Sequence, residues 1–215
     1  MYKALIFDLD GTLLNTSPDI CKTVNASLAQ FGCPPITLEQ TIKFVGNGAK
    51  KLIERAVPDQ FSQLTDKIYS LYLKLFAACD NSFTRLYDGE EQFLNRVSAS
   101  GIKTAIVTNK PQDATEAVCA KLLSPFRFDF ISGQTQKFAL KPDPALTLSV
   151  VQSWGFSPRD CVFIGDGETD IMTAANAGMD CISVLWGYRP KKSLEEAGGR
   201  VFACDFAQLE RLIFD

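Results

Sequence analysis

Short apolar segments alternate with longer amphipathic segments along most of this 215-residue chain, and this alternation restricts its possible folds more than any other feature. The apolar segments are rich in Ile, Val and Phe and end at polar residues or glycine, as strands buried on both faces do. The predicted strands are 4–7, 102–107, 128–131, 161–164, 181–184 and 201–203, and the predicted helices among them are 89–99, 111–122, 142–154, 168–177 and 206–213. Because strands that alternate with helices pair in parallel, we predict an α/β fold with a Rossmann-like, doubly wound parallel sheet.

The interval between the first two predicted strands is long and helical. Ser17 is the predicted N-cap of a helix that ends at Gly32, Thr37 opens a second helix, and further helices are predicted over 49–57 and 59–79. An apolar stripe in the last helix is expected to pack on a neighbouring helix, and it comprises Leu64, Ile68, Leu71, Leu75 and Ala78. We therefore predict an α/β core of residues 1–14 and 84–215, and an inserted all-α helical cap of residues 15–83 at the ligand-binding edge, where a lid would lie.

Composition and charge restrict the partners of the chain. The net charge is −3 and no basic run exceeds two residues, so we expect neither nucleic acid nor a membrane surface as a partner. No apolar stretch reaches the roughly 18 residues of a spanning helix, and Asp8 and Asp10 interrupt what would be the apolar part of a signal peptide. Seven scattered cysteines without a CxxC pair fit thiols in a reducing compartment, so we expect a cytoplasmic protein. It is expected to be a monomer or a homodimer.

Histidine is absent from the chain. This absence excludes Ser-His-Asp, Cys-His and histidine-phosphatase mechanisms, as well as zinc sites built on histidine. Acid–base chemistry must therefore come from Asp, Glu, Lys, Tyr or Cys side chains, and no motif supports a catalytic cysteine.

Four polar clusters accompany the predicted strands. Asp8 and Asp10 follow the first strand, Thr108-Asn109-Lys110 follows the second, Lys141 lies in a loop before a helix, and the segment 165–170 follows the strand that ends at residue 164. Strand side chains alternate between faces, so Asp8 and Asp10 point the same way, and two converging carboxylates need a cation or a proton between them. All four clusters are expected at the carboxyl edge of the sheet, where ligands bind.

Each cluster also has an ordinary structural explanation. The residues after position 107 could cap the next helix, Lys141 could be a solvated surface lysine, and Asp166 and Asp170 could be an N-cap and a first-turn acid. Asp8 and Asp10 have no such explanation, because no helix start there requires a cap. Because four clusters at corresponding strand ends favour one shared site, we predict Mg²⁺ binding and phosphoryl transfer.

These residues together resemble the four motifs of the haloacid dehalogenase superfamily of phosphatases. The motifs are Asp8-Leu9-Asp10-Gly11-Thr12, Thr108-Asn109, Lys141 in a Lys-Pro-Asp-Pro segment, and Asp166 with Asp170. The resemblance spans the whole core, and the helical insertion resembles the small cap of that family. Within the family, segments 45–49 and 52–56 are similar to the cap of bacterial phosphoglycolate phosphatases. Asn15 and Gly167 depart from the family pattern, in which aspartate and serine or threonine are common.

The resemblance implies a Mg²⁺-dependent phosphatase that hydrolyses a small-molecule phosphomonoester through an aspartyl-phosphate. It makes Asp8 the nucleophile and Asp10 the acid–base residue, and Asp10 argues against dehalogenation because a carbon–halogen bond needs no leaving-group proton. The implied catalytic residues are Asp8, Asp10, Thr108 and Lys141. The implied metal ligands are Asp8, Asp10 through its carbonyl, Asp166 and Asp170, with Asp170 acting one shell out. The implied phosphate-binding residues are Gly11, Thr108, Asn109 and Lys141.

The cap is expected to select the substrate. Gly46, Asn47 and Gly48 offer amides at a helix start, which suits a small carboxylate, and Lys50 would add positive charge. A plain turn between helices explains this loop equally well. The alternatives left open are a phosphatase of sugar phosphates, nucleotides or pyrophosphate and a β-phosphoglucomutase-like phosphomutase; a phosphate-binding regulatory domain is disfavoured because every catalytic position is filled.

Overall fold

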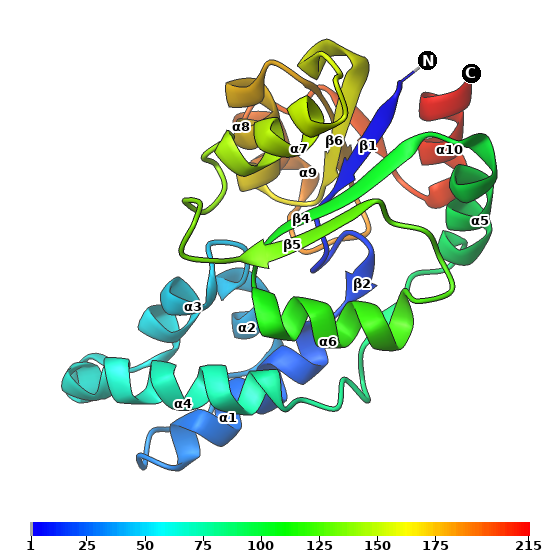
Figure 1. Cartoon of the computed structure of the whole chain (residues 1–215). Coiled ribbons are helices and arrows are strands. Elements are labelled where there is room, and N and C mark those ends of the chain that lie inside the picture. Colours follow the sequence, from blue (N-terminus) through cyan, green and yellow to red (C-terminus); the bar gives the residue numbers. More distant parts are fainter. Residues whose placement is uncertain (1) are drawn as a thin grey trace.

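The computed structural model describes residues 2–215 as an α/β core with a helical unit on one side (Figure 1). Six strands form one sheet in the order β5-β4-β1-β6-β7-β8, and every neighbouring pair is parallel. The strands are β1 Ala4–Phe7, β4 Lys103–Pro111, β5 Phe130–Gln134, β6 Cys161–Gly165, β7 Asp180–Val184 and β8 Val201–Ala203. The predicted α/β fold is confirmed, with β1 in the middle of the sheet.

Helices cover both faces of the sheet. Leu5 and Phe7 of β1 pack with residues of α5, α6 and α10, whereas Ala4 and Ile6 pack with residues of α7 and α8. Strand side chains alternate between faces, so both faces of this central strand are buried. The helices are α5 Glu90–Ser100, α6 Gln112–Leu122, α7 Ala145–Ser153, α8 Glu168–Ala177 and α10 Phe206–Phe214, together with the short α9 Lys191–Glu196, which was not predicted, and the 3₁₀ helix η2 Pro158–Asp160.

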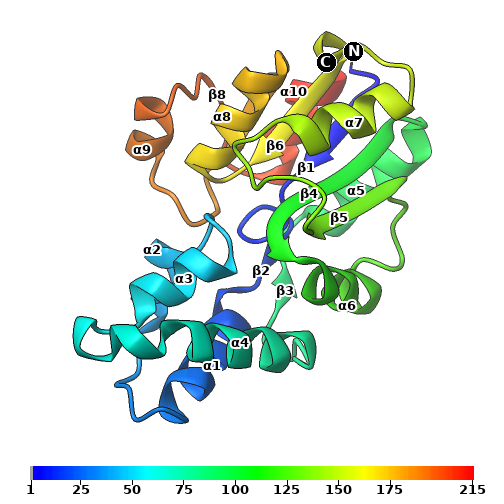
Figure 2. The same ribbon diagram turned by 60° about the vertical axis from the view of Figure 1, so that its left-hand side comes forward.

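The inserted unit has its own hydrophobic cluster. Its elements are α1 Ser17–Ala29, α2 Leu38–Phe44, α3 Ala49–Ala56, the 3₁₀ helix η1 Asp59–Leu64 and α4 Thr65–Ala77. These helices pack around Val24, Ile53 and Ile68, and α6 of the core contributes Ala114 to the same cluster. Figure 2 shows the unit lying beyond the end of the sheet at which β1 leads into β2. We call this unit the cap.

Two expectations for the cap helices were wrong. Thr16, not Ser17, occupies the N-cap position of α1, and its hydroxyl donates to Asp10 Oδ1 at 2.7 Å instead of capping the helix. The buried stripe of α4 consists of Ile68, Tyr72 and Phe76, whereas Leu75 is exposed. The buried stripe keeps a spacing of four residues from Ile68 onward, and its two aromatic residues line the cavity between cap and core.

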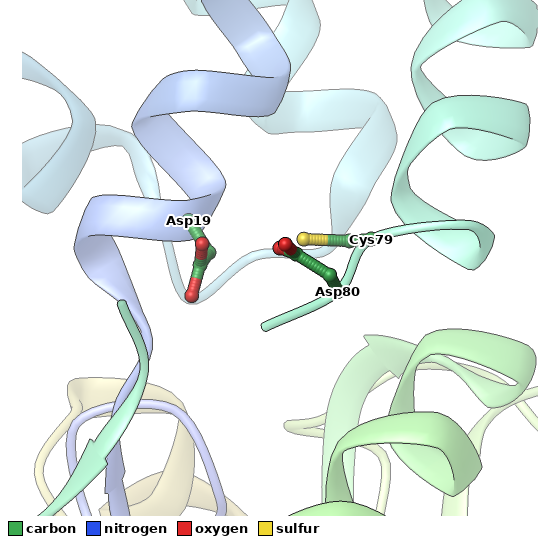
Figure 3. Close-up of side chains that lie close together, drawn as sticks. All are labelled: Asp19, Cys79 and Asp80. Atoms are coloured by element: carbon green, nitrogen blue, oxygen red, sulfur yellow. The ribbon is translucent and has the colours of Figure 1, made fainter. Parts of the chain in front are cut away.

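The two linkers between core and cap pair with each other. β2 (Leu14–Asn15) and β3 (Arg85–Leu86) form an antiparallel ribbon. Beside it, Asp19 Oδ2 accepts hydrogen bonds from the Phe83 amide at 3.0 Å and the Thr84 hydroxyl at 2.7 Å. Figure 3 shows Asp19 next to Cys79 and Asp80 of the second linker. These contacts attach the start of α1 to the chain that leaves the cap.

Among residues 2–215, the helices are all too short or too polar to cross a membrane.

Candidate active site

A bulge in β4 brings one of the predicted clusters to the edge of the sheet. The pairing between β4 and β5 shifts register between Val107 and Pro111, so the intervening Thr108-Asn109-Lys110 leaves the regular ladder. Bulges of this kind redirect side chains at strand ends. All three residues are buried where the cap covers the core.

Three carboxylates meet where β1 and β6 end. Asp8 follows β1, Asp166 follows β6 and Asp170 lies in the first turn of α8, and an oxygen of each lies within 4.8 Å of the other two. The Gly167 amide donates to Asp170 Oδ2 at 2.9 Å, so the start of α8 fixes this carboxylate. Asp166 accepts from the Thr12 hydroxyl at 3.2 Å and from the Tyr188 amide at 2.7 Å. The structure thus gathers the side chains of three of the four predicted metal ligands.

Lys141 lies against this carboxylate cluster. Its Nζ donates to Asp170 Oδ1 at 2.7 Å and lies 2.9 Å from Asp8 Oδ1, and its side chain is only 3% exposed. Burial alone would disfavour the charged amine, but the carboxylates of Asp170 and Asp8 outweigh it and raise the pKa of Lys141 above its ordinary value. The lysine is therefore a permanent positive charge beside Asp8.

The cluster still holds more negative charge than one lysine offsets. Burial, reinforced by Asp170 and Asp8, raises the pKa of Asp166 to about 8. Burial also raises the pKa of Asp170, although Lys141 opposes the shift. Such shifts arise where buried carboxylates lack a cation.

The donor set of the cluster fits Mg²⁺. Among residues 2–215, Asp8 Oδ1 is buried and accepts no aligned hydrogen bond, and its ion-pair partner Lys141 Nζ lies 2.9 Å away. Its neighbours Asp166 and Asp170 offer carboxylate oxygens, the hard ligands that Mg²⁺ prefers. The three carboxylates are therefore suited to hold the predicted ion.

Two glycines allow Asp166 to reach the cluster. A Cβ atom on Gly11, whose φ is +91°, would lie 2.4 Å from Asp166 Oδ2, and a Cβ on Gly187 would lie 2.2 Å from Asp166 Cβ. Both contacts are shorter than real atoms allow. Gly11 was predicted as a phosphate-binding residue, and the geometry gives it a packing role beside the acid cluster as well.

Asp10 has different partners from Asp8. Its Oδ1 accepts from the Thr16 hydroxyl at 2.7 Å and from Lys110 Nζ at 2.9 Å, and its Oδ2 lies 3.3 Å from the same Nζ. The Asp10 side chain therefore faces the cap and is not one of the three carboxylates that meet. Lys110 was expected at this edge as part of the Thr108-Asn109-Lys110 cluster but was given no role in the site.

A cavity lies between this site and the cap. Its volume is about 40 Å³, which is enough for a few water molecules, so it suits a small ligand. Asp8, Asp10, Thr108 and Lys110 line its core side, and Gly46 and Gly48 line its cap side. The remaining lining is mostly apolar: Ile20, Val45, Ala49, Leu52, Tyr72, Phe76 and Pro111, with Asn109.

Asn109 joins the core to the cap through its side chain. Its Nδ2 donates to the Gly46 carbonyl at 3.0 Å and to the Lys141 carbonyl at 3.1 Å, and its Oδ1 accepts from the Lys141 amide at 2.8 Å. These bonds occupy the carboxamide, so this side chain positions Lys141 and the cap loop. Any contact of Asn109 with phosphate would have to come from its backbone.

The predicted cap residues are only partly brought to the cavity. Gly46 and Gly48 line it, whereas Asn47 and Lys50 are not among the described residues that do. Lys50 Nζ instead pairs with Asp66 and lies 5.2 Å from the centre of the Tyr69 ring. Its charge is therefore directed toward α4 and away from the cavity.

A loop after β7 supplies further contacts that the sequence pattern did not indicate. The Tyr188 hydroxyl accepts from the backbone amides of Thr16 at 3.0 Å and Ser17 at 2.9 Å, at the start of α1. Arg189 donates to the Ile42 carbonyl at 2.8 Å and to the Val45 carbonyl, at the end of α2. This loop therefore contacts Asp166 of the carboxylate cluster, the first linker and the cap.

Comparisons with known proteins agree with this geometry. A family model described as haloacid dehalogenase-like hydrolase matches residues 5–184. The chain is 35% identical to a phosphoglycolate phosphatase of Xanthomonas campestris pv. campestris over 187 residues, which cover 87% of this chain and 85% of that protein. It is 31% identical to a phosphoglycolate phosphatase of Haemophilus influenzae over 220 residues, covering 97% and 96% of the two chains.

A solved structure is similar throughout. It comes from Lactobacillus delbrueckii subsp. bulgaricus and is provisionally named a phosphoglycolate phosphatase. It superposes with a TM-score of 0.91 at 30% identity, and the match covers 99% of this chain and 98% of that one.

Proposed function

The chain belongs to the haloacid dehalogenase-like hydrolase family and is a phosphomonoester hydrolase, and from this premise we propose that it hydrolyses phosphoglycolate with Mg²⁺ through an aspartyl-phosphate. The observation that supports the proposal most directly is the meeting of Asp8 with Asp166, Asp170 and Lys141 beside a small cavity under the cap. Phosphoglycolate is proposed because two relatives that align over most of their length are named for it.

Asp8 is the proposed nucleophile. Its carboxylate oxygen forms a bond to phosphorus while the bond from phosphorus to the ester oxygen breaks. A carboxylate and a phosphate repel by about 4 kcal/mol at 4 Å and an effective dielectric constant of 20. Lys141, which lies 2.9 Å from Asp8, offsets part of this repulsion, and the hydroxyl of Thr108 is a donor for a phosphoryl oxygen.

Asp10 is the proposed acid–base residue. It gives a proton to the leaving ester oxygen and later takes one from the water that hydrolyses the aspartyl-phosphate, a role worth about 10²- to 10⁴-fold. Its side chain lines the cavity on the cap side of Asp8, where a leaving group would lie. Thr16 and Lys110 hold it in that position.

Mg²⁺ would be held by Asp8 and Asp166, with Asp170 beside them, and when bound it supplies positive charge that screens the phosphate from Asp8. The same three carboxylates would otherwise repel one another. We also propose that residues 15–83 act as one cap domain that closes over the substrate, since their helices share a hydrophobic cluster.

Phosphate release by the purified protein tests the proposal. Phosphoglycolate, hexose phosphates, nucleoside monophosphates and pyrophosphate are compared in the presence of Mg²⁺. We expect phosphoglycolate to give the highest kcat/KM, EDTA to abolish release and added Mg²⁺ to restore it. Mg²⁺ should also raise the Tm of the intact protein but not that of Asp166→Asn, because an ion that binds only the folded state stabilises it.

Activity that resists EDTA would contradict the metal role. A higher kcat/KM for a hexose phosphate would replace phosphoglycolate as the substrate while leaving the phosphatase mechanism standing.

A further inference from the structure

Three cationic side chains lie near the proposed active site: Lys110 and Lys141 are buried and Arg189 is half-buried. Two of them do not line the cavity. Lys141 is held by Asp170 and Asp8 on the metal side. Arg189 pairs with Glu168 through Nε and donates to the Ile42 and Val45 carbonyls through its two terminal nitrogens. Lys110 is the third, and its partners leave capacity to bind a ligand.

Lys110 is the sole cation among the described residues that line the cavity. Its side chain is 1% exposed, and the hydrogen bonds of Nζ go to Asp10 alone among residues 2–215. An ammonium group has three N–H donors, so two contacts with Asp10 leave one donor free. Nζ also lies 4.3 Å from the centre of the Phe76 ring, which stabilises the charge without accepting a conventional hydrogen bond.

The surroundings of Lys110 make an anionic ligand favourable. The cap side of the cavity is formed by apolar side chains such as Ile20, Leu52 and Phe76, which give a low local dielectric. A charge-assisted hydrogen bond is stronger in such a site than in water. A neutral hydroxyl accepts a weaker hydrogen bond from this donor than a carboxylate does.

The position of Lys110 matches the part of a substrate that leaves. Nζ lies within 3.3 Å of both oxygens of Asp10, the residue proposed to protonate the leaving oxygen. In phosphoglycolate the carboxylate is separated from the ester oxygen by a single methylene. A substrate oxygen next to Asp10 therefore has its carboxylate within reach of Lys110.

We propose that Lys110 is the specificity-determining residue of this site and selects small phosphomonoesters whose leaving group bears a carboxylate close to the ester oxygen. The proposal rests on the proposed function and adds to it the residue that recognises the carboxylate. It assigns to the core a selection that the sequence pattern had assigned to Gly46, Asn47 and Gly48 of the cap, with Lys50 adding charge.

A matched pair of substrates tests this assignment. 2-Phosphoglycolate and 2-hydroxyethyl phosphate are similar in size, but only the first bears a carboxylate. We expect the wild-type protein to show a kcat/KM about 10- to 100-fold higher for 2-phosphoglycolate, the range expected for one hydrogen bond between charged groups. Lys110→Met should reduce this ratio to near one, and Lys110→Arg should retain most of it.

Lys51→Met is the control variant, because Lys51 is an exposed lysine of α3 that pairs with Glu54. It should keep the wild-type ratio. Loss of the contact with Asp10 in Lys110→Met is expected to slow both substrates, so the ratio, and not the absolute rate, is the deciding quantity.

Two results overturn the inference. Wild-type protein that hydrolyses both substrates with equal kcat/KM contradicts it, even if Lys110→Met fails to fold. A ratio in a folded Lys110→Met that equals the wild-type ratio does so as well. Failure to hydrolyse either substrate overturns the proposed function itself, and the inference with it.

Discussion

Asp8 and Asp10 are two residues apart, yet they belong to different electrostatic environments. Asp8 faces the buried acids Asp166 and Asp170, and its Oδ1 has no aligned donor among residues 2–215. Asp10 is held by a hydroxyl and by Lys110. Two equal side chains therefore have unequal surroundings, which is what a nucleophile and an acid–base residue need.

Asp8→Asn should lose activity without losing stability. The amide cannot attack phosphorus, so we expect phosphate release to fall by roughly 10⁴-fold or more. The substitution also removes one of three clustered carboxylates, so the Tm measured in EDTA should stay equal or rise. Phosphate release and thermal unfolding of the same preparations are the measurements.

Asp59→Asn provides the control for this change, since Asp59 is an exposed acid of the cap and belongs neither to the described cavity lining nor to the carboxylate cluster. Both its activity and its Tm should match the wild type. Substantial turnover by a folded Asp8→Asn variant would falsify the nucleophile assignment.

At the scale of a single element, the start of α5 contains a buried acid. Glu90 is the first residue of the helix, and its Oε2 accepts from the Tyr87 amide at 3.0 Å, whereas its Oε1 has no partner among residues 2–215. Burial raises the pKa of Glu90 to about 8, and the Tyr87 hydrogen bond only partly opposes the shift. The helix terminus favours an acid here, but burial disfavours its charge.

The stability of the protein should therefore fall as pH rises toward this pKa and level off above it. The folded state keeps the Glu90 proton up to about pH 8, whereas the unfolded chain loses it near pH 4.5. The stabilisation from protonated Glu90 is fully present below about pH 4.5 and is lost as pH approaches 8. Glu90→Gln should flatten this slope and raise the free energy of unfolding at pH 8 by about 1–3 kcal/mol.

Urea unfolding at several pH values between 5 and 9 measures this effect. Glu91→Gln is the matched control, because Glu91 is the exposed neighbour in the same helix turn. An equal pH slope for wild type and Glu90→Gln would show that Glu90 does not titrate in this range.

For the molecule as a whole, the loop after β7 supplies part of the contact between core and cap, beside Asn109 and α6. Tyr188 binds Asp166 through its amide and the start of α1 through its hydroxyl, while Arg189 binds the carbonyls at the end of α2. The carboxyl end of a helix has partial negative charge, so an arginine there stabilises the contact between this loop and α2. Two adjacent residues of this loop therefore connect the carboxylate cluster with the cap.

Arg189→Met should weaken cap closure. Removing its bonds to the Ile42 and Val45 carbonyls lowers the population of the closed arrangement, and apparent affinity falls with that population. We expect KM for phosphoglycolate to rise about 10-fold with a smaller change in kcat, and amide hydrogen exchange in α2 to increase. Steady-state kinetics and hydrogen exchange measure the two effects.

Lys192→Met, a change at an exposed lysine of α9, should alter neither quantity. Unchanged KM and unchanged exchange in Arg189→Met would contradict the role of this arginine in cap closure.

Much of this architecture could be predicted because it depends on local patterns. The alternation of apolar and amphipathic segments predicted the parallel sheet, since the spacing of apolar residues in each segment indicates which of its faces is buried. Asp8, Thr108, Lys141, Asp166 and Asp170 could be placed together because parallel strands end at one edge. The bounds of β1, α8 and β8 were predicted to the residue.

Only the tertiary structure decided which side chains pair at the edge. Lys110 meets Asp10 across 100 residues, and Arg189 meets Ile42 across 147. Local periodicity in the sequence does not predict such contacts, because they depend on how the β4 bulge and the cap are oriented in space. The sequence by itself determined the sheet and the acids at its edge. Tertiary packing determined the partner of Lys110 within the core, that of Lys50 within the cap, and those of Arg189 between the two.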